Sequence, residues 1–331
     1  MVLEAIFSYS GVRTHPVKIL VMSILLSSFA IFISYHLFPN AASVSALLIV
    51  ALGLMPIIHS IFVAEETAEA RHPGPTLGFM ARHFSLVKIY GWFFIGLVIS
   101  YSFWFVVLPL EKPQNCAEGG GFECIMPTKD KVFMEQENSW RAITGGNFTE
   151  ITTAKAVEVG KGYSECKNDS TKSIPACFEL VFMNNTMVLL LAVLLSFLLG
   201  AGALWLLSWN ASVMGLFIGK EILTTDIGMG ILRAVSFVPH GIPELVGYFI
   251  GAIAGGIISV AITKKKYMTH EFEIIAKDVL ILLFFALFFL LIGGIIEAVA
   301  IVSGDSMLIL LVTLGSWLIM GLVAAFVILK K

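Results

Sequence analysis

The chain has 331 residues, of which 58% are hydrophobic and 13% are charged. Soluble proteins are roughly 45–50% apolar and about 25% charged, so this composition excludes a typical soluble enzyme. The 21 basic and 23 acidic residues nearly cancel. No cluster of lysines and arginines carries interleaved aromatic residues, which argues against nucleic acid as a partner.

Six long apolar segments predict transmembrane helices. Each has about 20 residues, the length that a helix needs to cross about 30 Å of hydrocarbon. Their apolar residues are continuous rather than alternating, which favours helices over barrel strands. We therefore expect an all-α polytopic membrane protein with six plain transmembrane helices. The segments are residues 19–38, 41–63, 89–108, 187–209, 279–302 and 307–329.

The distribution of lysine and arginine over the short connections predicts the orientation. Basic residues occur before the first segment, between the second and third, after residue 263 and at the C-terminus, but not at 39–40 or 303–306. Because basic loops stay in the cytosol, both termini are predicted to be cytoplasmic in a multi-pass protein of the cell membrane. A signal peptide is the alternative for the first segment, but its apolar core exceeds the roughly 7–15 residues typical of one.

Residues 109–185 form a polar insert between the apolar segments, and the same orientation places it on the extracytoplasmic side. It holds 19 of the charged side chains and all four cysteines. The chain thus divides into an N-terminal three-helix membrane segment (1–108), this insert and a C-terminal membrane segment (186–331). Residues 129–143 predict an amphipathic helix, and the insert as a whole is the candidate surface for a protein partner.

The cysteines and the glycosylation triplets agree with an extracytoplasmic insert. Four cysteines in an oxidising compartment predict two disulfides, with three pairings open. A zinc site is the alternative, although no two cysteines have C-x-x-C spacing. Asn-x-Ser/Thr triplets are candidate N-glycosylation acceptors. The cysteines are Cys116, Cys124, Cys166 and Cys177, and the acceptors are Asn147, Asn168 and Asn184.

Residues 210–262 differ from an ordinary span. They connect two predicted cytosolic points, so they cross the bilayer either twice or not at all. Four charged residues between 220 and 233 would be costly in a helix facing lipid. We expect a broken or re-entrant helical pair, and interrupted backbone at membrane depth can bind ions or polar solutes. The expected helices are 211–223, 228–237 and 244–262, with breaks at 224–226 and 239–243.

The sequence Pro-His-Gly-Ile-Pro-Glu at 239–244 combines a helix start with two ionisable groups. Pro243 favours the first turn of a helix, which is why we expect one to begin at residue 244. Glu244 in that first turn is favoured by the exposed amide groups, and His240 can fold back toward its carboxylate. Simple helix capping is the alternative explanation.

This motif and the residues around it resemble the signature of the stage II sporulation protein M family of membrane proteins. In that family a Pro-His-Gly-x-x-Glu-Leu phrase opens a helix rich in small residues, as residues 239–245 and the glycines after them do here. Asn210 after an apolar segment and Ile-Glu-Ala at 296–298 also match, so the resemblance covers roughly residues 187–302. It implies an α-helical fold and, from the sporulation members of the family, a membrane complex that brings cell-wall hydrolases to one place. It implies no enzymatic activity.

Two further polar residues lie inside apolar segments. Glu297 stands about two-thirds of the way along its segment, where a carboxylate needs a partner, a proton or water. We expect it to line the same site, with a position near the outer surface as the alternative. His59 is a weaker candidate, since packing explains it equally well. His240, Glu244 and Glu297 are ligand types for a divalent cation, but the sequence does not establish a ligand set, and we expect no cofactor.

Two functions fit these features. The first is a channel or transporter-like protein for an ion or small polar solute. The second is a non-catalytic scaffold, as a monomer or a homo-oligomer, that recruits an extracytoplasmic partner through the insert. An intramembrane metalloprotease is the enzyme alternative, and it fits poorly because His-x-x-x-Glu is not the expected ligand pair. The residues expected to line the route of the first function are His240, Glu244, Glu297 and Asn210.

Overall fold

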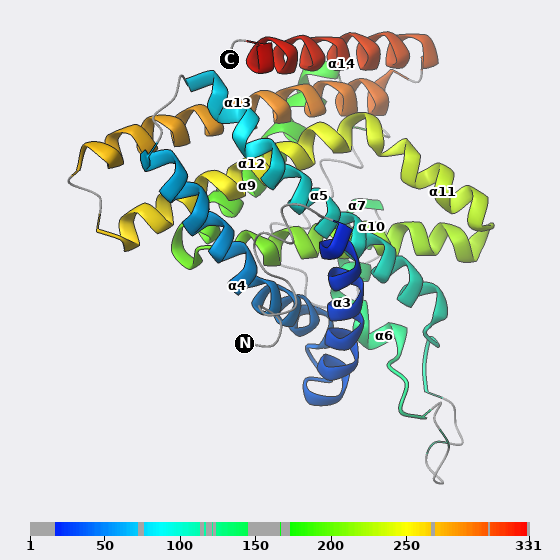
Figure 1. Cartoon of the computed structure of the whole chain (residues 1–331). Coiled ribbons are helices and arrows are strands. Elements are labelled where there is room, and N and C mark those ends of the chain that lie inside the picture. The colour runs from blue at the N-terminus through cyan, green and yellow to red at the C-terminus, as the bar shows by residue number, and fades with distance from the viewer. Residues whose placement is uncertain are drawn as a thin grey trace.

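The computed structural model describes residues 17–71, 76–112, 116, 121, 124–144, 166, 173–265, 269–303 and 305–329. For residues 65–71, 76–85, 142–144, 324 and 326–329 it describes the backbone alone. The regular structure of these residues is helical and includes no strand (Figure 1). The helices are α3 (Val17–Leu37), α4 (Ala42–Arg71), α5 (Thr76–Val107), α6 (Lys129–Val132), α7 (Met134–Thr144), α9 (Ile174–Leu199), α10 (Ala203–Thr224), α11 (Ile227–Ser236), α12 (Val238–Thr263), α13 (His270–Val302) and α14 (Ser306–Leu329).

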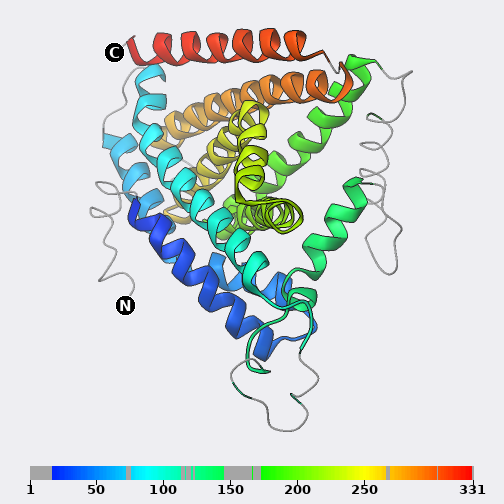
Figure 2. The same ribbon diagram turned by 90° about the vertical axis from the view of Figure 1, so that its right-hand side faces the viewer.

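Seven of the described helices are long and apolar enough to cross a membrane: α3, α4, α5, α9, α12, α13 and α14. The predicted fold class, an all-helical protein with several apolar helices, is therefore confirmed. Helix α14 lies along one edge of the molecule beside α13 (Figures 1 and 2). Most of its described side chains are exposed, whereas α12 is the most buried of the seven.

The predicted plain span over residues 187–209 is wrong at both ends. Helix α9 begins 13 residues earlier, at Ile174, and stops at Leu199. Gly200 ends it with a φ of +72°, in the left-handed region that residues with a Cβ rarely adopt. The chain then turns through Gly202 and begins α10 at Ala203. The apolar run continues across this turn, so apolarity alone could not locate it.

Helix α10 passes through the middle of the bundle. Gly215 lies against Tyr101 and Gly219 against Phe105, so α10 runs parallel to α5. No residue between 203 and 222 is exposed, because α4, α5, α7 and α11 cover the helix. A helix that other helices enclose can carry polar residues that lipid would not tolerate.

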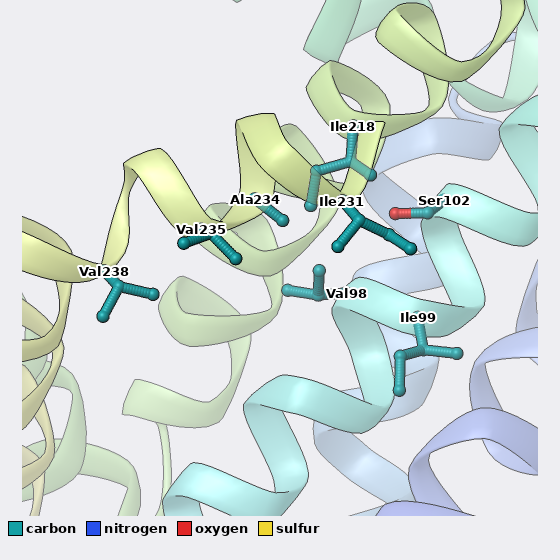
Figure 3. A pocket seen from close by; sticks show the side chains of 8 residues that line it. All are labelled: Val98, Ile99, Ser102, Ile218, Ile231, Ala234, Val235 and Val238. Carbon is teal, nitrogen blue, oxygen red and sulfur yellow. The ribbon is translucent and has the colours of Figure 1, made fainter. Parts of the chain in front are cut away.

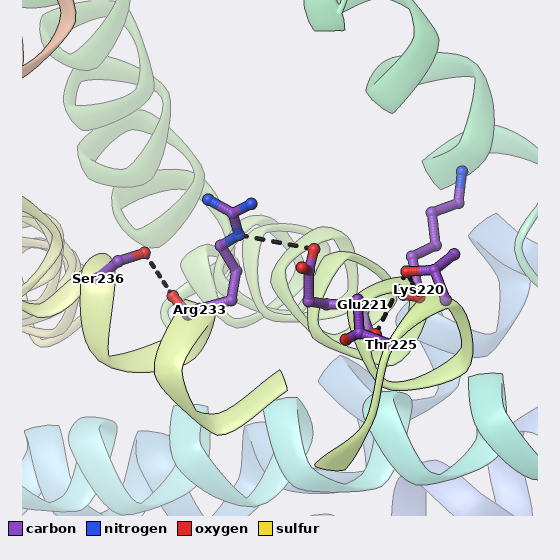
Figure 4. A network of polar contacts seen from close by, with 6 residues as sticks. Lys220, Glu221, Thr225, Arg233 and Ser236 are labelled. Atoms are coloured by element: carbon purple, nitrogen blue, oxygen red, sulfur yellow. Dashed lines mark hydrogen bonds and ion pairs between the residues drawn. The ribbon is translucent and has the colours of Figure 1, made fainter. Parts of the chain in front are cut away.

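The predicted break at 224–226 is confirmed. Helix α10 ends at Thr224, and α11 begins after Asp226, whose carboxylate accepts a hydrogen bond from the backbone N–H of Met229 at 3.0 Å. This is an N-cap, which satisfies one of the free amide groups of the helix start. An ion pair joins the two helices, with 3.6 Å between the Arg233 Nε and Glu221 Oε2 atoms (Figure 4).

The predicted break at 239–243 is wrong, because α12 begins at Val238 and continues through Pro243. Pro239 lies in the first turn, where the missing N–H costs nothing. Pro243 lacks the N–H that would bond the Pro239 carbonyl four residues earlier. The Trp317 indole of α14 donates to that carbonyl instead, at 3.1 Å. A tertiary contact thus supplies the bond that the proline removes.

Glycines allow α12 to approach its neighbours closely. Gly251 lies against Leu189, and Gly255 against the Val193 carbonyl, so α12 runs parallel to α9. Gly247 contacts the Ala286 carbonyl of α13. Small residues spaced four apart let helix backbones pack together in a membrane, where apolar burial gives little drive for association.

The helix expected at 129–143 is present as α6 and α7, with a kink at Phe133. It packs against the bundle instead of forming a separate domain. Phe133 is fully buried with its ring 5.1 Å from that of Phe105. Gln136 is also fully buried, and its amide donates to the Ser212 hydroxyl of α10 at 3.1 Å. Part of the polar insert therefore belongs to the core.

The four cysteines form the two expected disulfides, and the structure resolves their pairing. Cys116 pairs with Cys124, and Cys166 pairs with Cys177 at the start of α9. The second disulfide packs against Ala298 near the end of α13. It therefore ties the insert to the helices that carry the candidate site.

The Lys220–Glu137 ion pair holds the insert on α10, with 2.7 Å between Nζ and Oε2 and both side chains about three-quarters buried. We expect Lys220→Met to lower the free energy of unfolding by about 1–2 kcal/mol, because Glu137 loses a partly buried charged partner. The control is Lys277→Met, which breaks a pair of equal length, Lys277–Glu273, that is more than half exposed. That change should cost clearly less, because solvent screens an exposed ion pair. Equal losses in thermal unfolding of the two variants would contradict the structural role of Lys220.

Candidate polar site between three helices

A cluster of buried polar side chains lies where α9, α12 and α13 meet. The Tyr248 hydroxyl donates to the Asn185 Oδ1 at 2.8 Å. The Asn185 amide lies close to the Glu244 carboxyl. Nevertheless, Nδ2 of Asn185 and Oε1 of Glu244 are both buried and have no hydrogen-bond partner within 3.5 Å in the described part of the chain, so the two groups interact only at a longer distance. Unpaired buried polar groups are rare in proteins, and each one calls for an explanation.

Gly293 on α13 makes room for the Glu244 side chain. A Cβ at position 293 would stand 2.5 Å from Cγ of Glu244 and 3.2 Å from its Oε1. The same Cβ would stand 3.1 Å from the His240 carbonyl. The carboxyl group therefore lies directly against the α13 backbone, at a place that only glycine leaves open.

His240 and Glu297 each lie one helical turn from the contact between Glu244 and Gly293. His240 precedes Glu244 by four residues on α12 and is half-buried, with its ring 6.0 Å from that of Phe237. Glu297 follows Gly293 by four residues on α13 and is also half-buried. Since α12 and α13 run antiparallel, this register places Glu297 toward the end of α12 that carries His240. Three of the expected residues thus occupy neighbouring turns of two packed helices.

Asn210 and His59 lie elsewhere. The Asn210 amide donates to the Leu206 carbonyl of its own helix at 2.9 Å, and α10 packs on α4, α5, α7 and α11 rather than along α12. His59 is exposed on α4 and lies beside Gly200, at the turn between α9 and α10. Neither residue joins the Glu244 cluster.

The glycosylation candidates have different surroundings from those expected. Asn184 lies within α9, an apolar helix long enough to span a membrane, and its amide is 3.5 Å from the Asn185 Oδ1. Acceptor asparagines normally lie in surface loops. Asn147 and Asn168 lie outside the described residues.

Sequence reasoning missed Asn185, Tyr248 and Gly293. The available signal was a polar triplet, Asn184-Asn185-Thr186, directly before an apolar run. We interpreted it as a glycosylation acceptor, although the helix that contains it starts ten residues earlier. Tyr248 and Gly293 lie within apolar stretches of the sequence, and no local sequence feature marks them as part of a polar site.

The described residues contain no group of three or more His, Cys, Asp or Glu side chains arranged to hold a metal ion. The Glu244 cluster instead offers one carboxyl oxygen and one amide nitrogen without partners. A carboxylate accepts hydrogen bonds and an amide nitrogen donates them. The carboxyl oxygen alone could hold a cation, whereas the two atoms together suit a small polar group that both donates and accepts.

A model of the family described as Stage II sporulation protein M matches residues 89–300. The match extends from the middle of α5 almost to the end of α13, and it includes Asn185, Glu244, Tyr248, Gly293 and Glu297. Searches of the curated proteins and of the solved structures found no match.

Proposed function

Because the chain belongs to the stage II sporulation protein M family, whose matched region contains the Glu244 cluster, we propose that it moves an ion or small polar solute across the membrane. Glu244 binds the solute in this proposal. The observation that carries it is the buried carboxyl oxygen of Glu244, which has no hydrogen-bond partner among the described residues. The expected cell-membrane location agrees with seven helices that are apolar enough to span.

The energetics of burial support a binding role. A polar group without a partner in apolar surroundings costs roughly 1–3 kcal/mol, and a charged group costs more. Ionisable residues inside membrane helices commonly mark the path of an ion or a substrate. A bound polar solute that both donates and accepts would supply the missing partners of Glu244 and Asn185 together, whereas a cation would partner the Glu244 oxygen alone.

The position of Glu244 suggests how passage would occur. It lies about two turns, roughly 9 Å, into α12 from the end nearer the insert. Beyond it, Gly251 and Gly255 lie in close contact with α9, and Gly256 with Phe62 of α4. Passage therefore requires a second arrangement in which these contacts open, as in alternating access around a fixed site.

We infer that the insert faces the extracytoplasmic side and that both termini are cytoplasmic. The disulfides Cys116–Cys124 and Cys166–Cys177 support this orientation, since disulfides persist in oxidising compartments. The basic residues of the short connections support it independently.

Flux into liposomes tests the transport proposal. Purified full-length protein is reconstituted, and uptake of H⁺, Na⁺ and K⁺ is measured separately with indicator dyes. We expect Glu244→Gln to reduce uptake of the transported ion more than tenfold, because the amide cannot carry the negative charge that holds a cation. The control is Glu273→Gln, which removes an exposed carboxylate from the first turn of α13. Absence of uptake of all three cations by the wild type would contradict the cation form of the proposal, and equal uptake by Glu244→Gln would contradict binding at Glu244.

A scaffold is the second candidate, and the docking of α7 favours it. Gln136 and Glu137 fix this part of the insert on α10 through Ser212 and Lys220. A partner that bound the insert would therefore be held in a defined position on the membrane protein. Family resemblance implies a complex with cell-wall hydrolases. Photo-crosslinking from the exposed insert residue Ile125 should then capture an extracytoplasmic protein, and crosslinking from the exposed control position His270 should not. The reconstituted protein should show no flux in liposomes.

A further inference from the structure

An apolar pocket lies between α5, α10, α11 and the first residue of α12, apart from the Glu244 cluster (Figure 3). Its volume is about 400 Å³. Helix α5 contributes Val98, Ile99 and Ser102, and α11 contributes Ile231 and Val235. Ile99, Ile231 and Val235 are each about half exposed, so the pocket opens on the outside of the bundle.

The Ser102 hydroxyl is the polar group of this pocket. Ser102 is 9% exposed, its Oγ has no hydrogen-bond partner among the described residues, and it points into the pocket (Figure 3). Buried serines elsewhere in the bundle, such as Ser23 and Ser208, donate to the carbonyl four residues earlier in their own helix. A serine in a helix normally has that option. The Ser102 hydroxyl therefore keeps an unused hydrogen-bond donor at the wall of the pocket.

The position of the pocket identifies the kind of occupant. Ser102 lies five residues, roughly 7.5 Å, before the end of α5 that leads to the insert. Val98 and Ile99 lie one turn deeper in the same helix. A chain that entered from the insert-side leaflet would place its hydrocarbon against these deeper residues and its polar end near Ser102. Pockets of this size accept small molecules and parts of larger ones.

We propose that this pocket binds one hydrocarbon chain of a membrane glycerolipid, with an oxygen at the glycerol end of the chain accepting a hydrogen bond from Ser102. The apolar walls match a hydrocarbon chain, and the hydroxyl supplies the single donor that a glycerol linkage oxygen can use. Helix α11 forms one wall, so the bound chain fills the space between α11 and α5. This lipid site is independent of the proposed transport function.

Photolabelling tests the location of the lipid. The full-length protein is reconstituted in phosphatidylcholine vesicles with a trace of phosphatidylcholine carrying a diazirine in its acyl chain. Labelling should concentrate on Val98, Ile99, Ile231 and Val235. Ala234→Phe should reduce this labelling about tenfold, because the ring occupies the pocket. The control is Leu232→Phe on the same helix, at an exposed position that does not line the pocket. Labelling spread evenly around the bundle, or unchanged in Ala234→Phe, would overturn the proposal.

Ser102→Ala tests the hydrogen bond. Because the hydroxyl has no protein partner, its removal should leave thermal unfolding of delipidated protein unchanged. Native mass spectrometry should show about fivefold less phosphatidylcholine retained by the variant, the effect of losing one neutral hydrogen bond. Equal retention by wild type and variant would refute a role for Ser102 in binding the lipid.

Discussion

Gly255→Ala is expected to destabilise the protein by about 1–3 kcal/mol, and Gly255→Leu is expected to prevent folding. A Cβ at position 255 would clash with the Val193 carbonyl of α9 and would stand 2.9 Å from the Ser196 Cβ atom. Backbone atoms cannot rotate away as a flexible side chain can. The helices α9 and α12 would therefore separate, and the contacts along both would weaken.

Gly91→Ala on α5 is the matched control, because a Cβ there would meet nothing within 4 Å. Alanine has a higher helix propensity than glycine, so this variant should be as stable as the wild type or more stable by up to about 1 kcal/mol. Thermal unfolding in detergent compares the wild type, Gly255→Ala and Gly91→Ala. If Gly255→Ala were as stable as Gly91→Ala, close packing of α9 on α12 would not be needed for the fold.

Gly293→Ala is expected to reduce solute uptake more than tenfold without changing any charged residue. The new methyl group would occupy the space of the Glu244 Cγ atom, 2.5 Å away, so the carboxyl must leave its place against α13. A displacement of about 1 Å at a binding or reacting group can cost roughly 10²-fold in activity. Uptake into liposomes is the measurement, with the folded fraction determined on the same preparation.

Gly294→Ala, at the adjacent position, controls for the general effect of a methyl group on α13. Its Cβ would meet Phe178 at 3.4 Å, an ordinary van der Waals contact. Uptake by this variant should match the wild type. Wild-type uptake by both alanine variants would show that the position of the Glu244 side chain does not matter for transport. A loss in both would point to the packing of α13 on α9 instead.

Much of the fold could be predicted from the sequence, because crossing a bilayer requires long apolar helices whatever their neighbours are. Helix breaks were harder to place. The break after Thr224 was predicted correctly, since Asp226 is a local N-cap. The break expected at Pro243 does not exist, because α12 continues through it, and Trp317, which is distant in sequence, donates to the Pro239 carbonyl that the proline leaves without its helical partner.

The candidate site was predicted in part. Glu244 was recognisable as an ionisable group near a histidine, although the helix expected to start there starts six residues earlier, and Glu297 as a carboxylate inside an apolar segment. Asn185 was not recognised, because its partner Tyr248 is on another helix. Asn210 was expected at the site, but its amide bonds its own helix. Helix packing decides which polar residues come into contact, and a local sequence pattern does not predict those contacts.

The sequence by itself determined the membrane-helical character of this protein, the polar insert with its four cysteines and the family signature around Glu244. These are properties of composition and local order, which the preference of each side chain for lipid or water sets directly. The tertiary structure decided the disulfide partners, the enclosure of α10, the continuation of α12 through Pro243 and the Asn185–Tyr248–Glu244 cluster. Each of these depends on contacts between segments far apart in the chain, where packing and hydrogen-bond partners set the free energy.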